Sequence, residues 1–276
     1  RCADVTGVQT CALPISFQSD QSSVSGDVVL SPIQKCFFTE AQRDHHHFNQ
    51  SVLLSFHGEV PEQHVRIIFK KILEHHDALR MVFNESNGQI VQINQSADAI
   101  EVAISVHDLR TAVRPFEELR SISNQIQNSI NLEHGPLLKL GLFYFNGETR
   151  LLIVIHHLVV DSVSWRILFE DIDTLYQQTM EDKTMSLPLK TDSFQSWATY
   201  LQQYVGNEAF EKRVPYWKAI LDQKSERIER DYPDGDNLMG DMEKVSIYLD
   251  RSSTERLLTG IHQAFGTQVN DILLTA

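Results

Sequence analysis

Apolar residues recur along this chain with two different periods, which predict helices and strands in alternation. After Pro61 they return at Val65, Ile68 and Phe69 and continue with the same spacing to Leu73. This i, i+3, i+4 spacing predicts an amphipathic helix, and a proline in the first turn suits its start. Similar patterns predict a short helix from Pro32 and helices over residues 115–132, 163–177, 194–204, 207–222 and, capped by Ser252 or Ser253, to about residue 265.

Strand-like segments lie between these helices, over residues 48–56, 80–83, 90–93, 101–106, 137–145, 150–155 and 245–249. The segments at 80–83 and 90–93 flank Glu85-Ser86-Asn87-Gly88, which predicts a hairpin. Residues 150–155 are apolar on both faces, which is typical of a central strand. The alternation of helices and strands, with hairpins among them, predicts an α/β fold built on a mixed sheet.

The composition is that of an ordinary globular protein, and it excludes several classes of partner. Over 276 residues, 24 Lys and Arg stand against 37 Asp and Glu, for a formal net charge of −13. That charge repels phosphate backbones and anionic lipid, so we expect no nucleic-acid and no membrane partner. The longest strictly apolar run, residues 151–155, is far shorter than the ~18 residues of a spanning helix. Cys2, Cys11 and Cys36 form no CxxC pair and fit no disulfide framework, which predicts a reducing, cytoplasmic setting.

The two ends of the chain differ from its middle. Residues 1–16 have no helical or strand period and look like translated adapter sequence, so we expect them to be non-native. Residues 17–27 are polar and predict a linker. Asn270 and Asp271 are expected to cap a helix that would begin at Ile272, four residues before the last one, Ala276. We therefore expect a fragment that is open at both ends.

The strongest candidate for chemistry follows the predicted central strand, where His156 and His157 lie side by side. Neighbouring strand residues face opposite sides of a sheet, so only one of the two can reach a given cleft and the other must be structural. Asp161 or Ser162 can then cap the next helix. An imidazole at such a loop can accept a proton near neutral pH.

Simpler interpretations compete with this one. A buried histidine is often only a hydrogen-bonded filler, and an aspartate at a helix start is most often only a cap. A metal site would require His157 and Asp161 to share a helical face and to find a third ligand, and the pattern indicates neither, so we expect no metal. The clusters at residues 45–47 and at His75-His76 follow no buried strand and are expected to be solvated.

The segment from His156 to Asp161 resembles the HHxxxD motif of the condensation superfamily of nonribosomal peptide synthetases, whose members share a chloramphenicol acetyltransferase-like fold. Segments that resemble the family's other motifs accompany it in order, at residues 30–34, 48–54, 75–80, 163–168 and 269–276. The resemblance runs from about residue 26 to the end and implies a mixed-sheet sandwich. It places an N-terminal half-domain at residues 28–190, and connecting helices with the truncated start of the second half at 191–276. Ser162 stands where the family usually has glycine, and Cys36 where it usually has tryptophan.

Within the superfamily, residues 32–34 (PIQ), 48–51 (FNQS) and the VSW sequence after the motif look like the epimerization branch. That resemblance implies inversion at Cα of an aminoacyl or peptidyl thioester carried on the 4'-phosphopantetheine of a peptidyl carrier domain, beside adenylation and condensation modules. No cofactor would be bound permanently. Peptide-bond condensation, or a catalytically silent docking role on the same fold, remain alternatives.

The resemblance also implies roles for single residues. His157 would be the base and His156 its structural neighbour, while Asp161 would hold the loop, with Arg80 as a candidate ion-pair partner. Backbone N–H groups near Val163 and Ser164, in the loop from Ser162 to Trp165, would stabilise the enolate oxygen. A second acid/base, a glutamate in the second half of the domain, would lie outside this sequence, so residues 1–276 alone are expected to be inactive.

Overall fold

The computed structural model describes residues 19–39, 45–99, 101–223, 231–232, 235, 242–261 and 266–275. The expectations for residues 1–16, including Cys2 and Cys11, and for most of the predicted loop at 223–241 lie outside the described residues. The chain divides into two compact units, Arg1–Ile220 and Leu221–Ala276. The first unit contains both sheets and the predicted catalytic segment.

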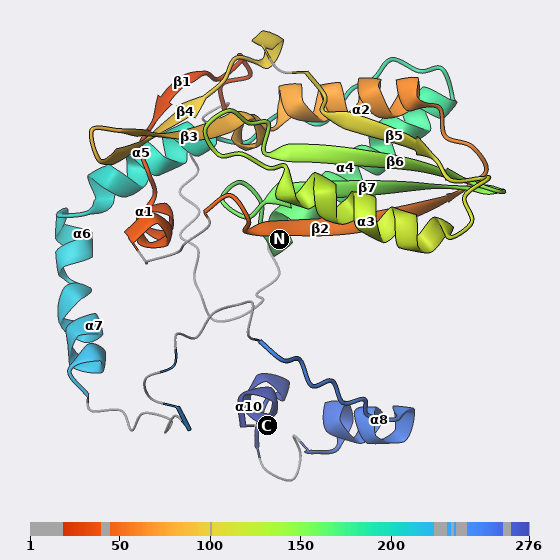
Figure 1. Ribbon diagram of the computed structural model, residues 1–276. Coiled ribbons are helices and arrows are strands. Elements are labelled where there is room, and N and C mark those ends of the chain that lie inside the picture. Colours follow the sequence, from red (N-terminus) through yellow and green to blue (C-terminus); the bar gives the residue numbers. More distant parts are fainter. Residues whose placement is uncertain are drawn as a thin grey trace. The chain divides into compact units, whose positions relative to one another are not determined.

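A four-stranded sheet forms the centre of the first unit, in the order β2-β7-β6-β5 (Figure 1). Its strands are β2 (Asn49–His57), β7 (Glu148–His156), β6 (Leu138–Phe145) and β5 (Ile104–Asp108). β7 pairs antiparallel with β2 and β6, whereas β5 pairs parallel with β6. The sheet is therefore mixed, with β7 inside it, and both predictions are confirmed.

Helices cover both faces of this sheet. α3 (Pro115–Asn128) packs on one face, and α2 (Glu62–His75) and α4 (Ser162–Met180) pack together on the other (Figure 1). The close approach of α3 requires a glycine, because a Cβ at Gly141 would lie 2.7 Å from Cδ1 of Ile126. Alternating strand residues thus enter two separate apolar layers, which explains why β7 is buried on both sides.

A smaller antiparallel sheet, β1-β4-β3, lies beside the first one (Figure 1). It consists of β1 (Gly26–Val28), β4 (Gln89–Asn94) and β3 (Met81–Ser86). β3 and β4 form the predicted hairpin. β1 begins within the predicted linker, and the side chain of Gln21 bonds both the carbonyl and the N–H of Lys190, so this stretch is fastened to the folded body. The remaining elements up to the boundary between the two units are α1 (Pro32–Thr39), η1 (Asp77–Arg80), η2 (Ala97–Ala99), α5 (Phe194–Tyr204), α6 (Glu208–Glu211) and α7 (Val214–Leu221), whose last residue belongs to the second unit.

Three local predictions differ from the structure. The single helix predicted at 207–222 is two helices, α6 and α7, separated by a short turn. The predicted strand at 245–249 is absent; its side chains are exposed, and no described strand pairs with it, so its β-rich composition has no ladder to join. The cap of α8 (Arg251–Thr259) is Asp250 rather than a serine, because its carboxylate accepts the N–H of Ser253 at 2.7 Å.

The last predicted cap also differs. α10 (Val269–Thr275) already contains Asn270 and Asp271, so neither precedes the helix. The carboxylate of Asp271 instead accepts the backbone N–H of Gln268 at 2.7 Å, one residue before the helix starts. Among the described residues, no helix combines the length and apolar character needed to cross a membrane.

Candidate functional site

β7 delivers the two adjacent histidines to different surroundings. His156, its last residue, is 0% exposed. Its Nε2 donates to the carbonyl of His45 at 2.9 Å, and its Nδ1 accepts the N–H of Leu158 at 3.2 Å. Burial lowers the pKa of His156 to about 4. Both ring nitrogens are occupied and the ring is neutral at physiological pH, which suits the structural role expected for His156.

His157 faces the α2/α4 side, and its hydrogen bonds define its tautomer. Because a carbonyl can only accept, Nδ1 carries the proton that is donated to the oxygen of Val160 at 2.8 Å. Nε2 lies 3.0 Å from the amide nitrogen of Gln50 and accepts from it. The amide oxygen of Gln50 in turn accepts Nε1–H of Trp165 at 2.7 Å, which fixes the orientation of the amide. This network makes Nε2 the ring nitrogen that carries the lone pair, and therefore the atom that can accept a proton.

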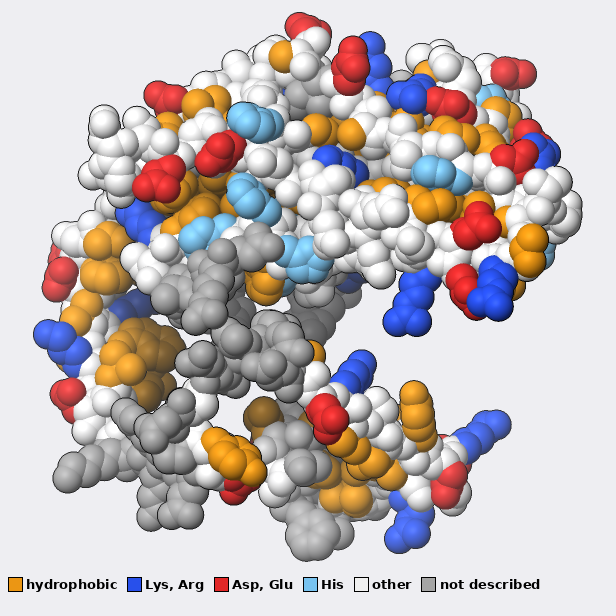
Figure 2. Space-filling model, viewed as in Figure 1, with side chains coloured by type: hydrophobic (Ala, Val, Ile, Leu, Met, Phe, Trp, Pro, Cys, Tyr) orange, Lys and Arg blue, Asp and Glu red, His pale blue; other side chains and the backbone are white. Residues whose placement is uncertain are grey.

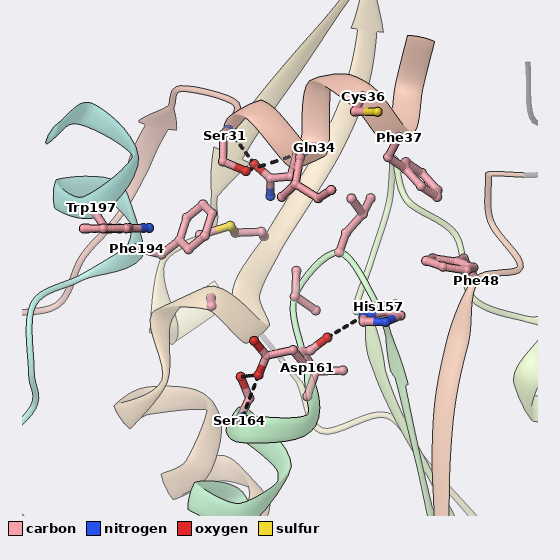
Figure 3. Close-up of a pocket in the computed structure, with 16 residues that line it drawn as sticks. Ser31, Gln34, Cys36, Phe37, Phe48, His157, Asp161, Ser164, Phe194 and Trp197 are labelled. Carbon is pink, nitrogen blue, oxygen red and sulfur yellow. Dashed lines mark hydrogen bonds between the residues drawn. The ribbon is translucent and has the colours of Figure 1, made fainter. Parts of the chain in front are cut away.

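A cavity of about 740 Å³ adjoins this ring. Figure 3 shows His157 on one side of it, with Phe37 and Phe48 nearby and Phe194 and Trp197 from α5 across from them. Phe48 stacks on His157 with ring centroids 5.0 Å apart and an interplanar angle of 17°. The volume lies in the range of small-molecule sites, and the walls are mostly apolar with few polar groups.

Asp161 holds the start of α4, as predicted. Its Oδ1 accepts both the backbone N–H and the hydroxyl of Ser164, each at 2.7 Å (Figure 3). These hydrogen bonds lower the pKa of Asp161, with smaller contributions from other neighbours that include His157. The carboxylate therefore shapes the turn that follows His157 by capping the helix.

The proposed ion pair between Asp161 and Arg80 is wrong. Arg80 is 1% exposed, and its guanidinium donates to the carbonyls of Leu73 at 2.5 Å, of Val24 at 2.8 Å and of Gln95 at 3.0 Å. Burial lowers its pKa. Arg80 thus joins the end of α2 to the segment before β1 and to the end of β4, whereas Asp161 is solvent-exposed. The loop carboxylate needs no arginine, because N–H groups at the start of α4 already stabilise its negative charge.

The oxyanion role expected for the loop is not supported either. The N–H of Ser164 is taken by the Asp161 carboxylate, and that of Trp165 donates to the Asp161 carbonyl at 3.0 Å. The backbone N–H of Val163 is also directed at the carboxylate. Ser162 and Val163 are exposed and do not line the cavity. These groups cap α4, and Trp165 acts on the site through its side chain instead.

The other histidine clusters are less solvated than predicted. His75 and His76 are both half-buried, and Nε2 of His76 lies 2.7 Å from Oδ2 of Asp171 on α4. Desolvation lowers the pKa of His75. Among the described residues, His75, His76 and Asp171 form the group able to hold a metal ion, with candidate ligand atoms within 4.8 Å of one another. His45 and His46 are half-buried as well. That the His157 site uses no metal stays a prediction.

Sequence reasoning missed the partners of His157. Phe48 and Gln50 lie in the FNQS segment that resembles the family, but the sequence predicts no role for either. Trp165 is expected only as part of the loop whose backbone N–H groups would stabilise the enolate oxygen. The signal that finds Gln50 is the strand register, since it sits opposite Ile155, two residues before the catalytic candidate. That register is a property of the folded sheet. On the face drawn in Figure 2, basic and acidic side chains are interspersed.

Comparisons with known proteins identify the family of this chain. The family model described as "Condensation domain" matches residues 24–276. Tyrocidine synthase 2 of Brevibacillus parabrevis is 40% identical over 265 residues, which are 96% of this chain and 7% of that protein. The chain therefore spans a small fraction of this relative.

Two solved structures share the fold. The epimerization domain from the third module of tyrocidine synthetase B aligns with a TM-score of 0.86 and 40% identity, over 93% of this chain and 59% of that one. The starter condensation domain of rhizomide synthetase aligns with a TM-score of 0.63 and 17% identity, over 72% of this chain and 49% of that one. The second similarity is one of fold alone.

Proposed function

This chain belongs to the condensation-domain family of nonribosomal peptide synthetases, and from that premise we propose that it is an epimerization domain, which inverts Cα of an aminoacyl or peptidyl thioester held on a carrier domain. One observation carries the proposal: the chain is 40% identical to a solved epimerization domain over 93% of its length. The solved condensation domain is 17% identical, with a TM-score of 0.63 against 0.86.

His157 is the proposed base. Removing the Cα proton gives an enolate whose charge spreads into the thioester carbonyl, and Nε2 of His157 is the atom that takes the proton. Nδ1–H remains donated to the carbonyl of Val160, which stabilises the positive ring once it forms. In the free protein the amide of Gln50 donates a hydrogen bond to Nε2 of His157, and this hydrogen bond must break before Nε2 can accept the Cα proton.

The substrate would arrive on the phosphopantetheine arm of a peptidyl carrier domain in the same synthetase, beside adenylation and condensation modules. The cavity of about 740 Å³ provides room for a tethered acyl group at His157. Inversion also needs an acid/base on the opposite face of Cα to return the proton. His157 supplies one half of this chemistry, and no permanently bound cofactor is invoked.

Product identity tests the proposal. A carrier domain loaded with an L-aminoacyl group would be incubated in D₂O with the synthetase that carries this chain, without an acceptor. We expect a D/L mixture with deuterium at Cα. An unchanged L-aminoacyl group that forms a new amide only when an acceptor thioester is added would instead establish condensation. If neither product forms and the domain still recruits a tailoring enzyme, the catalytically silent docking role is the one that remains.

A further inference from the structure

Gln34 lies in the first turn of α1, where it forms a reciprocal cap with Ser31. The backbone N–H of Ser31 donates to Oε1 of Gln34 at 2.9 Å, and the backbone N–H of Gln34 donates to Oγ of Ser31 at 3.4 Å. Because a backbone N–H can only donate, the amide oxygen must face Ser31 and the amide nitrogen must point the other way. The cap thus fixes which end of the amide faces the rest of the molecule.

That amide nitrogen has no hydrogen-bond partner, although Gln34 is only 3% exposed. A buried donor without an acceptor is costly, and the cap does not require one. The carboxylate of a glutamate would accept the N–H of Ser31 equally well, and glutamate is as usual as glutamine at this position of a capping box. The unpaired donor therefore calls for a separate explanation.

The nitrogen belongs to the cavity that contains His157. Figure 3 shows it on the side of Gln34 away from Ser31, directed toward the interior that Phe194 and His157 also line. Among the described residues, several other buried side-chain atoms also lack a partner, but none of their residues lines this cavity. The neighbouring walls are largely apolar and offer few acceptors, so a ligand that enters the cavity can supply the acceptor for this donor.

We propose that Gln34 is a substrate-binding residue whose amide nitrogen donates a hydrogen bond to a carbonyl oxygen of the carrier-borne chain. This inference rests on the proposed function, because a phosphopantetheine thioester is the ligand that would enter the cavity. Such a chain carries a thioester carbonyl and amide carbonyls. Each of these oxygens accepts hydrogen bonds, and the mostly apolar cavity offers them few donors. The loop N–H groups cannot serve, since Asp161 occupies them.

The test measures binding rather than turnover. An aminoacyl-pantetheine in which an amide replaces the thioester is titrated into the wild type and into Gln34→Glu, which keeps the oxygen for Ser31 and removes the donor. We expect Gln34→Glu to bind at least about tenfold more weakly, the loss of one hydrogen bond. The titration is repeated with analogues in which each carbonyl in turn is a methylene. For one of them the two proteins should bind alike, and its missing carbonyl identifies the acceptor.

Two further variants separate binding from folding. Gln34→Met also lacks the donor and should give the same pattern if Gln34→Glu does not fold. Ser31→Ala weakens the cap but keeps the donor, so it should lower the melting temperature and leave the discrimination among analogues as in the wild type. Equal weakening for every analogue, unchanged binding by both Gln34 variants, or no binding of the parent by the wild type would overturn the proposal. Absence of Cα exchange with binding and discrimination intact would overturn only the epimerization assignment.

Discussion

Two His-His pairs in this chain have opposite surroundings. His156 is the last residue of β7 and His157 follows it directly, and their rings have different surroundings, one in the core and one beside a cavity. His75 and His76 lie at the end of α2, where their rings stay close, with centroids 4.8 Å apart. There His76 bonds a carboxylate on α4.

The difference shows that the element before a dipeptide decides what the dipeptide can do. A strand separates neighbouring side chains completely, which gives one imidazole a sealed, neutral environment and leaves the other available. The end of a helix keeps both side chains near the same packed neighbours, which suits a structural contact between α2 and α4. We propose that the His156-His157 pair, unlike His75-His76, can serve chemistry because β7 precedes it.

The largest expected loss of stability comes from the His75-His76 region. Arg80 donates to the carbonyls of Leu73 and Glu74 at the end of α2 and to two other carbonyls. Arg80→Met leaves these buried acceptors unpaired, so we expect the free energy of unfolding, measured by urea denaturation, to fall by about 3 kcal/mol or more. Combined with Asp161→Ala, the losses should add. A coupling energy above about 1 kcal/mol between the two substitutions would show that Arg80 and Asp161 do interact.

The second prediction concerns the sealed histidine. The pKa of His156 is lowered to about 4 from 6.5, so the unfolded chain binds its proton first as the pH falls. Its stabilising contribution is complete above pH 6.5 and is lost between 6.5 and 4, on the order of 3 kcal/mol in total. Urea denaturation across this range should show a shallower loss for His156→Gln than for the wild type. Identical slopes would mean that His156 is not sealed.

The smallest effect is expected at the turn after the pair. Asp161→Ala removes the cap of α4 and should lower the free energy of unfolding by about 1 kcal/mol, as measured by thermal denaturation. Asp161→Asn keeps an acceptor for the N–H of Ser164 and should lose less. A loss of several kcal/mol in Asp161→Ala would indicate a buried ionic role that the structure does not contain.

The main elements and the central strand could be predicted because their apolar periods are local and strong. Strand alternation predicted that the two histidines would have different surroundings, and the family resemblance indicated His156 as the structural one. What failed depends on distant contacts: Arg80 could not be placed without knowing that its guanidinium meets the segment at Val24, and His76 not without α4 beside it. Gln50 required the β2-β7 register. Composition favoured a strand at 245–249, but a strand needs a partner.

The most direct test of the central claim is Cα deuterium exchange of the carrier-bound aminoacyl group by His157→Gln, within the synthetase that carries this chain. Loss of a general base predicts exchange about 100- to 10,000-fold slower. His76→Gln is the matched control from the other pair, and it should lower stability while keeping the exchange rate per folded molecule. Exchange by His157→Gln at the wild-type rate would contradict the assignment of His157 as the base.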